Sequence, residues 1–319
     1  MAGRRLPGLA SVSDLIRLYK LSTRKALSQN FILDTNVTDK IARAALAGHN
    51  LNATQVVEVG PGPGSLTRSM LAQAPARVTV VEKDDRFRGS LVALAEAVGG
   101  APALDVIIGD MAQVEPARIR TDSAAAPELA LVGNLPFNVA TPLTVGWLGD
   151  MASCSGLFAN APTARASMTL MYQAEVGQRL TAAPGEPGYS RLSVLAAACA
   201  NAKVLYTFAP TIFVPPPKVS ASVVRFVPRP DAVLSPAIVA ALQDVTRVGF
   251  SLRRKTLRNA IKRAPDAWRA PVIAAVEDAG LASLRAGDVP VAAWLDLARV
   301  AAAFTTTAGT VAPTASAAQ

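Results

Sequence analysis

Cysteine and histidine are scarce in this chain of 319 residues, which has only Cys154, Cys199 and His49. A structural zinc site normally takes four cysteine or histidine ligands, so that class is excluded, and a disulfide-stapled scaffold is implausible. The same scarcity removes serine–histidine and cysteine–histidine nucleophilic catalysis unless His49 is the base. His49 follows Gly48 in a sequence typical of a helix end, and we therefore expect it to be a surface capping residue.

The chain also lacks a long uninterrupted hydrophobic run. Its longest uncharged internal segment, 129–149, is broken by two asparagines and two prolines, which excludes a bilayer-spanning helix. The uncharged segment 300–319 is rich in Thr, Gly, Pro and Ser, a composition typical of a disordered end. We expect no association with a membrane.

Acidic residues are the scarcer charged class, with 23 Asp and Glu against 32 Lys and Arg, a net charge of +9. This balance favours an anionic partner such as nucleic acid or an anionic membrane, although many globular proteins are basic for no such reason. The first 25 residues carry six basic side chains and one acid, which suits an organelle transit peptide or a basic helix of the mature fold. Hydrophobic residues make up 51% of the chain, so wholesale disorder is excluded.

Short β-rich runs alternate with helical patterns along the first part of the chain. We predict strands at 55–59, 77–82, 104–108, 129–132, 168–172, 204–208 and 222–227. We predict helices at 13–25, 36–47, 65–74 and 85–98, and loops at 113–126 and 181–189. The alternation predicts an α/β fold with a mainly parallel, doubly wound sheet, and the short last connections predict antiparallel strands at its end.

The alternation ends at Pro228-Arg229-Pro230-Asp231, and only helical patterns follow it. They lie at 235–248, 251–262, 265–279 and 290–303. We therefore predict a basic segment at 1–27, an α/β domain at 28–230, a small α-helical domain at 231–305 and a disordered tail at 306–319.

A glycine-rich loop, 60–64, directly follows the first of these strands and precedes a helix. Glycine lacks a Cβ, so the backbone can approach a ligand closely, but a tight turn is the simpler interpretation, and Ser65 departs from the dinucleotide-binding pattern. At the ends of the next two strands, Glu82 could accept hydrogen bonds from both ribose hydroxyls and Asp110 could reach an adenine amino group. Either acid alone could equally be a solvated strand end. Because ligands bind at the carboxyl ends of such strands, three consecutive suitable ends favour a binding site.

The segment Asn134-Leu135-Pro136-Phe137 ends the fourth strand and is the most specific local signal. An exocyclic aromatic amine is a poor nucleophile because its lone pair is delocalised into the ring. The Asn134 side-chain oxygen and the Leu135 carbonyl could hold its two protons and direct the lone pair at an electrophile, while Pro136 fixes the turn. Phe137 could stack on the base. The simpler interpretation is an Asn-initiated turn with a buried Phe.

A basic run without any acid lies between Val245 and Ala264. Such a run is usually a solvated face, but its length and its place after the α/β domain favour contacts with phosphates. Its members are Arg247, Arg253, Arg254, Lys255, Arg258, Lys262 and Arg263. Apolar residues at 252, 257 and 261 would seat this segment as a helix.

These motifs resemble those of the rRNA adenine N6-dimethyltransferases, which use S-adenosylmethionine, over about residues 15–303. The matching stretches are 28–34, 58–64, 109–110, 133–137, 191–194, 213–219 and 253–256. Ser28, Phe137 and the segment 5–7 are most similar to the mitochondrial branch of the family, which includes members recruited to transcription. The resemblance therefore implies a mitochondrial matrix protein.

The resemblance also implies the site and the substrate. S-adenosylmethionine would contact Asn30, Ile32, Gly60, Gly62, Glu82, Asp110 and Asn134; Ile32 stands where Leu is usual, a change that a backbone contact tolerates. The implied catalytic residues are Asn134, Leu135, Pro136, Phe137 and Phe213, with Phe213 on the other face of the adenine. The implied substrate is two adjacent adenines in a hairpin loop near the 3′ end of small-subunit rRNA, in the assembling subunit. We expect a monomer without a metal.

Three functions remain to be distinguished. Dimethylation by positioning of the amine needs no strong general base, because the amine loses its proton after attack. A non-catalytic mitochondrial ribosome-assembly or transcription factor would be marked by erosion of Gly60, Glu82 or Asn134, and all three are present. Ser65 and the turn at 134–137 argue against a nicotinamide-dependent oxidoreductase. We therefore predict an rRNA (adenine-N6,N6)-dimethyltransferase.

Overall fold

The structure is a computed structural model that describes residues 11, 12, 14, 30–101, 103–120, 127–159, 161, 165–229 and 233–308. The predicted helix at 13–25, apart from Asp14, lies outside these residues, as do residues 309–319 of the predicted disordered tail. The first part of that tail, 306–308, is not disordered, because the last helix of the chain continues to Ala308. The chain divides into two compact units, Met1–Gln178 with Ala200–Asp231 and Arg179–Cys199 with Ala232–Gln319. Each unit is described separately below.

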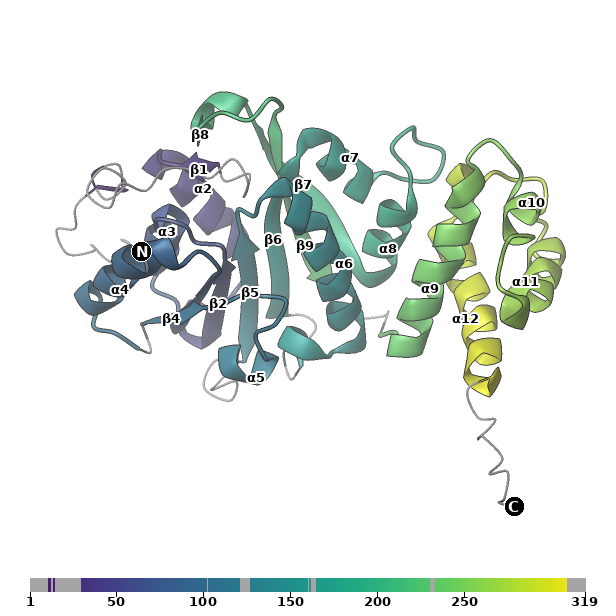
Figure 1. Cartoon of the computed structure of the whole chain (residues 1–319), viewed down its shortest axis with the longest axis horizontal. Helices are drawn as coiled ribbons and strands as arrows, with labels where there is room; N and C mark the ends of the chain where they lie inside the picture. Colours follow the sequence, from purple (N-terminus) through teal and green to yellow (C-terminus); the bar gives the residue numbers. More distant parts are fainter. Residues whose placement is uncertain are drawn as a thin grey trace, which may run out of the picture. The chain divides into compact units, whose positions relative to one another are not determined.

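A seven-stranded sheet forms the centre of the first unit, in the order β4-β3-β2-β5-β6-β9-β7 (Figure 1). Its strands are β2 (Thr54–Val59), β3 (Arg77–Glu82), β4 (Leu104–Ile108), β5 (Glu128–Gly133), β6 (Ala166–Gln173), β7 (Ala200–Phe208) and β9 (Ala221–Pro228). The strands from β4 to β6 are parallel, whereas β9 is antiparallel to β6 and β7. The predicted doubly wound sheet with antiparallel last strands is confirmed, and the chain reverses its direction of winding between β2 and β5.

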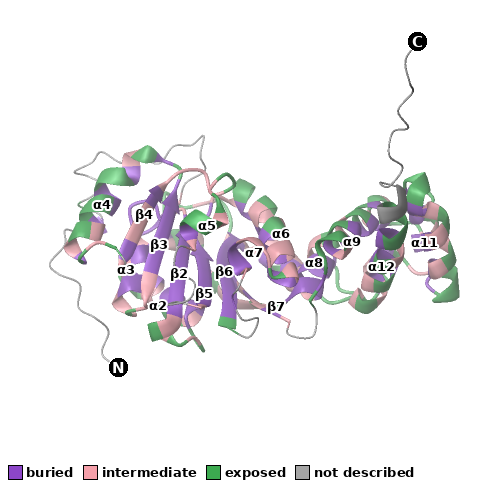
Figure 2. Ribbon diagram, turned by 90° about the horizontal axis from the view of Figure 1, so that it is seen from below, coloured by how far each residue is buried: buried purple, intermediate pink, exposed green. Residues whose placement is uncertain are grey.

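The two central strands, β2 and β5, are buried along their whole length (Figure 2). Helices cover both faces of a parallel sheet, so its central strands need apolar residues on both sides rather than an alternating pattern. Glu58 in β2 and Glu128 in β5 are the charged exceptions within these two strands. Glu58 lines the candidate functional site, and Glu128 is paired with His49.

Helices pack on both faces of this sheet. On one face α2 (Thr35–Ala45), α3 (Ser65–Ala72) and α4 (Arg88–Ala97) surround a common apolar core with Met171 of β6. Successive side chains of a strand point to opposite faces, so Tyr172 faces the other side, where its hydroxyl lies 2.6 Å from Thr144 of α6 (Phe137–Ser153). The shorter helices of this unit are η2 (Leu51–Ala53), η3 (Asp85–Phe87), α5 (Pro116–Ile119), η4 (Gly156–Phe158) and η6 (Pro210–Ile212), while α7 (Ala174–Thr181) runs across the unit boundary.

A short antiparallel ribbon joins two segments that are far apart in the sequence. Strand β1 (Phe31–Ile32) pairs with β8 (Phe213–Val214), with Ile32 opposite Phe213. After β1, the side chain of Asp34 accepts a hydrogen bond from the Asn36 N–H at 2.9 Å and so caps helix α2. The ribbon therefore holds Phe31 and Ile32 against the start of the segment 213–219, which contains three consecutive prolines.

In the described part of the second unit, the secondary structure is helical apart from an isolated bridge between Thr256 and Arg285. Its helices are α8 (Arg191–Cys199), α9 (Pro236–Gly249), η7 (Phe250–Leu252), α10 (Leu257–Ile261), α11 (Asp266–Asp278), η8 (Ala286–Asp288) and α12 (Val291–Ala308). A Cβ at Gly249 would lie 2.3 Å from the Trp294 ring, so glycine is what lets α9 approach α12 closely. The division at residue 230 drawn from the sequence leaves α8 in the α/β domain, whereas in the structure α8 packs against α9 and α12.

The single helix predicted at 251–262 is wrong. A 3-10 turn ends at Leu252, and α10 begins only at Leu257, after an extended Thr256 (φ −66°, ψ 155°) that bridges to Arg285. The apolar residues at 252, 257 and 261 keep helical spacing across this break, so their pattern could not reveal it.

In the part of the chain that the structure describes, no helix is long and apolar enough to cross a membrane.

Candidate functional site

A cavity of about 780 Å³ lies at the carboxyl ends of β4, β3, β2 and β5. It sits at the point where the winding reverses, the usual ligand site of such sheets, and its volume suits a small-molecule cofactor. The residues predicted from the sequence for the cofactor and the target base all line it, namely Asn30, Ile32, Gly60, Gly62, Glu82, Asp110, Asn134, Leu135, Pro136, Phe137 and Phe213. The structure thus brings together residues from six segments of the chain, while their individual roles stay predictions.

The glycine loop passes closely beneath neighbouring side chains. Gly60 and Gly62 have φ values of 67° and 55°, a left-handed conformation that glycine adopts without strain. A Cβ at Gly62 would lie 3.1 Å from the Phe31 ring, and one at Gly60 would lie 3.3 Å from Leu135. The loop therefore needs glycine both for its backbone shape and for its contacts.

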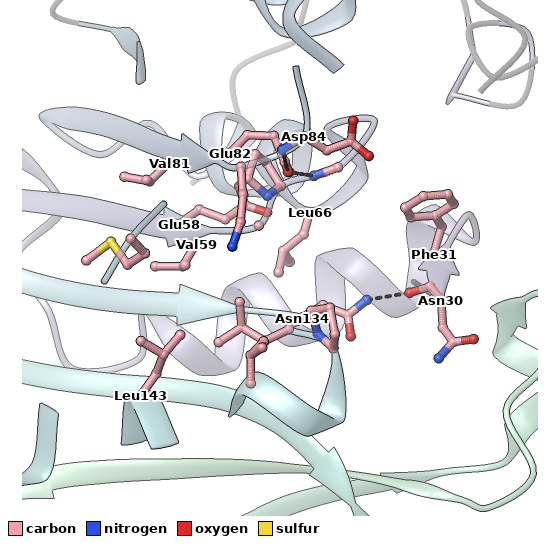
Figure 3. A pocket seen from close by; sticks show the side chains of 18 of the residues that line it. Asn30, Phe31, Glu58, Val59, Leu66, Val81, Glu82, Asp84, Asn134 and Leu143 are labelled. Carbon is pink, nitrogen blue, oxygen red and sulfur yellow. Dashed lines mark hydrogen bonds between the residues drawn. The ribbon is translucent and has the colours of Figure 1, made fainter. Parts of the chain in front are cut away.

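The Glu82 carboxylate is tied to this loop. Its Oε2 accepts a hydrogen bond from the Gly62 N–H at 2.9 Å, and its Oε1 accepts one from the Asp84 N–H at 2.8 Å (Figure 3). Burial raises the pKa of Glu82, and these backbone donors oppose the rise. Each carboxylate oxygen can accept a further hydrogen bond, so two ribose hydroxyls can still be bound.

Asp110 lies at the rim of the cavity. Its Oδ2 is 2.7 Å from the Lys83 ammonium, and its Oδ1 accepts a hydrogen bond from the Ala112 N–H at 3.0 Å. The hydrogen bond from Lys83 is the main cause that lowers the pKa of Asp110. Asp110 is therefore a charged acceptor, the form that an adenine amino group would require.

The Asn134 amide has a fixed orientation. Its Nδ2 donates a hydrogen bond to the Asn30 carbonyl oxygen at 2.9 Å, which leaves Oδ1 as the acceptor for a ligand (Figure 3). Pro136 precedes α6, and its carbonyl accepts hydrogen bonds from the first turn of that helix. Phe137, the first residue of α6, is half-buried and lines the cavity.

Phe213 differs from Phe137 in its exposure. It is only 2% exposed and belongs to the apolar core beneath the β1–β8 ribbon. A base could therefore contact the Phe213 ring only from inside the cavity.

The basic residues of the second unit are not equivalent. Arg253, Arg254, Lys255, Lys262 and Arg263 are exposed. Arg247 is ion-paired with Asp244, and Arg258 with Glu277. The two paired residues are less available to phosphates than the exposed set around the break between η7 and α10.

The prediction that His49 is a surface cap is wrong. Its side chain is 4% exposed, and its Nδ1 donates to Glu128 Oε2 at 3.2 Å, so Nε2 is free to accept from the Ser167 hydroxyl at 2.8 Å. Gly48 does end the helical segment with φ 82°, but the chain then turns inward towards β5 and β6. Burial and the charge of Arg225 lower the pKa of His49. Ser167 is 1% exposed, so this serine–histidine–acid group serves the core and not a substrate.

Phe31 and Glu58 are among the residues of the cavity wall that sequence reasoning missed. Phe31 packs on Gly62, a contact between distant segments that no local pattern indicates. Glu58 did leave a signal, because it is a charged residue between two valines of a buried strand, directly before the glycine loop.

The glycine loop on β2, the acids that follow β3 and β4 and the amide that follows β5 define the site of a class I methyltransferase that uses S-adenosylmethionine. The cavity fits this cofactor, since its wall offers close backbone approach and acidic acceptors at successive strand ends. The family model described as ribosomal RNA adenine dimethylase matches residues 20–298, and the chain belongs to that family. It is an S-adenosylmethionine-dependent rRNA adenine dimethyltransferase.

The relatives agree with this assignment. A protein of Phenylobacterium zucineum named ribosomal RNA small subunit methyltransferase A is 44% identical over 294 residues, which cover 92% of this chain and 93% of the relative. A protein of the same name from Xanthobacter autotrophicus is 42% identical over 257 residues, covering 81% and 83%.

Solved structures share the fold. The 23S rRNA methyltransferase ErmE is 25% identical with a TM-score of 0.58, and the match covers 85% of this chain and 99% of that one. A dimethyladenosine transferase from Plasmodium falciparum has a TM-score of 0.65 at 22% identity, covering 83% and 94%.

The prediction of a mitochondrial protein is wrong, because these curated relatives are bacterial. Phe137 contributes an aromatic ring, and stacking on a base needs only the ring, so this residue does not indicate a compartment. The other two features behind that prediction, Ser28 and the segment 5–7, lie outside the described residues.

Proposed function

We propose that this enzyme dimethylates N6 of two adjacent adenosines in the 3′-terminal hairpin loop of small-subunit rRNA, during assembly of the small ribosomal subunit. The observation that carries the chemistry is the Asn134 amide, whose Nδ2 is engaged by the Asn30 carbonyl so that Oδ1 faces the cavity as an acceptor. The names of relatives that are 42–44% identical support the choice of the small subunit.

The turn after β5 would position the target amine. Asn134 Oδ1 and the Leu135 carbonyl accept its two N–H donors, which turns the nitrogen lone pair towards the cofactor. The bound cofactor supplies an electrophilic methyl group on a sulfonium. Holding the amine in line with that group supplies much of the acceleration, and the proton leaves the nitrogen after attack.

Two aromatic side chains would hold the flipped base. Phe137 is half-buried at the start of α6 and offers its ring to one face of the adenine. Phe213 offers its ring from the cavity wall to the other face. Stacking of this kind tolerates a methylated amine, which a second round of transfer to the same nitrogen requires.

The second unit would hold the RNA backbone through Arg253, Arg254, Lys255, Lys262 and Arg263, whose exposed charges suit phosphates. The cofactor and target-base residues all come from one chain, which supports a monomer as the active form.

Transfer of a tritiated methyl group tests the proposal. The enzyme is incubated with naked small-subunit rRNA, immature small subunits and naked large-subunit rRNA, and the labelled nucleosides are then identified. We expect N6,N6-dimethyladenosine in the small-subunit RNA, with more label in immature subunits than in naked rRNA. Label in the large-subunit RNA alone would overturn the substrate assignment, and equal label in naked and assembling RNA would overturn the link to assembly.

A further inference from the structure

Two aromatic side chains of the edge strand β7, Tyr206 and Phe208, are separate from the residues that line the cavity. They pair with Val223 and Ala221 of β9, which belong to the apolar core beneath α2. Directly paired residues of neighbouring strands point to the same face of a sheet, so both rings face the side that α2 covers. Both are half-buried, and their ring centroids are 5.8 Å apart.

A β-bulge in β7 places the rings on this face. The register shifts between Val204 and Tyr206, so Leu205 is the extra residue. Lys203 pairs with Arg225, whose guanidinium donates hydrogen bonds to carbonyls at the end of α2, so Lys203 also lies on the α2 side. In a regular strand, positions 203 and 206 would point to opposite faces, and the bulge brings them onto one. Bulges at sheet edges often re-aim a side chain next to a functional site.

A cation completes this surface. The Lys40 ammonium on α2 lies 4.2 Å from the centroid of the Tyr206 ring and 5.8 Å from that of Phe208. Among the described residues its partners are these rings rather than a carboxylate, so its charge can still meet a phosphate. Because Lys40 lies over Tyr206, the Phe208 ring is the one left for a base.

The direction of β7 puts this surface at the same edge of the sheet as the cavity. Strands β6 and β7 are both antiparallel to β9 and so run in the same direction. Phe208, the last residue of β7, therefore lies at the edge where Asn134 follows β5. Strands β5 and β7 are three positions apart in the sheet, about 14 Å at the usual strand spacing (Figure 1). A stacked nucleic-acid strand covers that distance in about four nucleotides, at about 3.4 Å each.

The chemistry of the surface favours single-stranded nucleic acid as its partner. Aromatic rings beside basic groups stack bases and hold phosphates with little dependence on sequence. A second copy of this chain, with its net charge of +9, would bring positive charge to Lys40 and Lys203, and so would the basic segment 1–27. The polyanion alone complements these charges.

We propose that Lys40, Tyr206 and Phe208 form a second contact with the substrate RNA. Phe208 stacks on an unpaired base within about four nucleotides of the target adenosine, and Lys40 holds the neighbouring phosphate. Tyr206 keeps the ammonium in place through its ring. The inference rests on the proposed rRNA substrate, but it concerns capture of the RNA and not methyl transfer.

Binding to immature small subunits tests the stacking. Phe208→Leu keeps the apolar bulk of this half-buried position and removes the ring. We expect the affinity to fall at least about fivefold, the lower limit for one lost stack, and to be retained in Phe208→Tyr. Phe304→Leu, which removes an exposed ring on α12, is the matched control and should bind as the wild type does.

The salt dependence tests the phosphate contact. Lys40→Gln should reduce the slope of log affinity against log salt by about 0.7, the value for one phosphate of a single strand. Arg118→Gln should keep the wild-type slope, because Arg118 is exposed on α5, next to Ile119, whose carbonyl accepts a hydrogen bond from Gln55 near the start of β2. Arg118 therefore lies at the opposite edge of the sheet. Unchanged affinity for the product S-adenosylhomocysteine shows that each variant is folded.

Ultraviolet cross-linking of the wild type to immature small subunits needs no variant. The adducts are located by mass spectrometry after digestion with trypsin. We expect RNA adducts at Tyr206 or Phe208. The tryptic peptide 204–218 also contains Phe213, so its fragmentation separates an adduct on the proposed surface from one in the cavity.

Wild-type RNA affinity in Phe208→Leu, with adducts at cavity residues such as Phe213 but none at Tyr206 or Phe208, would overturn the inference and leave the methyltransferase assignment intact. If Phe208→Leu instead weakened binding to phosphatidylserine vesicles, or association between copies of the chain, at unchanged RNA affinity, RNA would not be the partner. A wild-type protein that binds immature small subunits without methylating them would overturn the proposed function and not this contact.

Discussion

The Asn134 side chain donates a hydrogen bond to the Asn30 carbonyl oxygen at 2.9 Å, although 103 residues separate them in the chain. This bond decides which end of the amide faces the cavity, because a flipped amide would set two acceptor oxygens against each other. Asn30 directly precedes β1, which pairs with β8. The orientation of the amide that aligns the target nitrogen therefore depends on the ribbon that also carries Phe213.

Replacement of Asn134 should nearly abolish methylation while RNA binding persists. Asn134→Ala removes one of the two acceptors for the amine, an interaction that matters most in the transition state. Loss of one positioned group of this kind lowers the rate by about 10²–10³. Single-turnover methylation of immature small subunits measures this, with Asn201→Ala, an exposed position on β7, as the control. Near wild-type rates for Asn134→Ala would show that the turn does not align the amine.

Replacement of Glu82 should weaken the cofactor complex. Glu82→Ala removes two charge-assisted hydrogen bonds to the ribose, each worth on the order of 1.5–3 kcal/mol, and also frees the Gly62 N–H that shapes the loop. We expect the affinity for S-adenosylmethionine to fall at least about tenfold, and less in Glu82→Gln, which keeps one acceptor oxygen. Calorimetric titration tests this, with Glu96→Ala on the exposed side of α4 as the matched acid. Unchanged affinity in Glu82→Ala would remove Glu82 from the site.

The strand ends of the site could be predicted from the sequence, and the contacts across it could not. Buried parallel strands appear as continuous apolar runs, so the chain positions of Glu82, Asp110 and Asn134 followed from where those runs stop. The pairing of β1 with β8 and the bond from Asn134 to Asn30 depend on segments brought together only by the complete fold.

The sequence also did not indicate which of the residues that follow a helix end are buried. His49 follows a glycine that ends a helical segment, and nothing local distinguishes a chain that then turns inward from one that stays at the surface. The break before α10 was hidden for a related reason. Leu257 is held there by a hydrogen bond from its N–H to the Leu284 carbonyl, which is a tertiary contact.

The basic residues should differ in their effect on RNA binding. Arg254 is exposed in the turn before α10, whereas Arg258 is ion-paired with Glu277, so reversing Arg254 is the cleaner test. Arg254→Glu should weaken RNA binding and reduce the slope of log affinity against log salt by about one, while binding of free cofactor is unchanged. Arg299→Glu on α12, an exposed arginine paired with Asp296, is the matched control. A salt slope equal to that of the wild type would mean that the run is only a solvated surface.

The buried His49 should make the folded protein sensitive to acid. Its pKa in the folded state lies below the ordinary value of 6.5, mainly because of burial and then because of Arg225, although Glu128 opposes this. Between these two pKa values the unfolded chain binds more protons than the folded one, so the free energy of unfolding falls as the pH drops below about 6.5. His49→Gln lacks this proton uptake and should lose less stability, the difference being at most about 1.4 kcal/mol per pH unit.

Urea denaturation of the wild type and His49→Gln at pH 7.5 and pH 5.5 measures this effect. The other titrating groups are present in both proteins, so their contributions cancel when the two pH dependences are subtracted. We expect the stability difference between the proteins to narrow on acidification, because only the wild type must place a proton on a buried imidazole or unfold. Parallel pH dependences would mean that His49 titrates alike in the folded and unfolded states, and that its bonds to Glu128 and Ser167 do not keep it neutral.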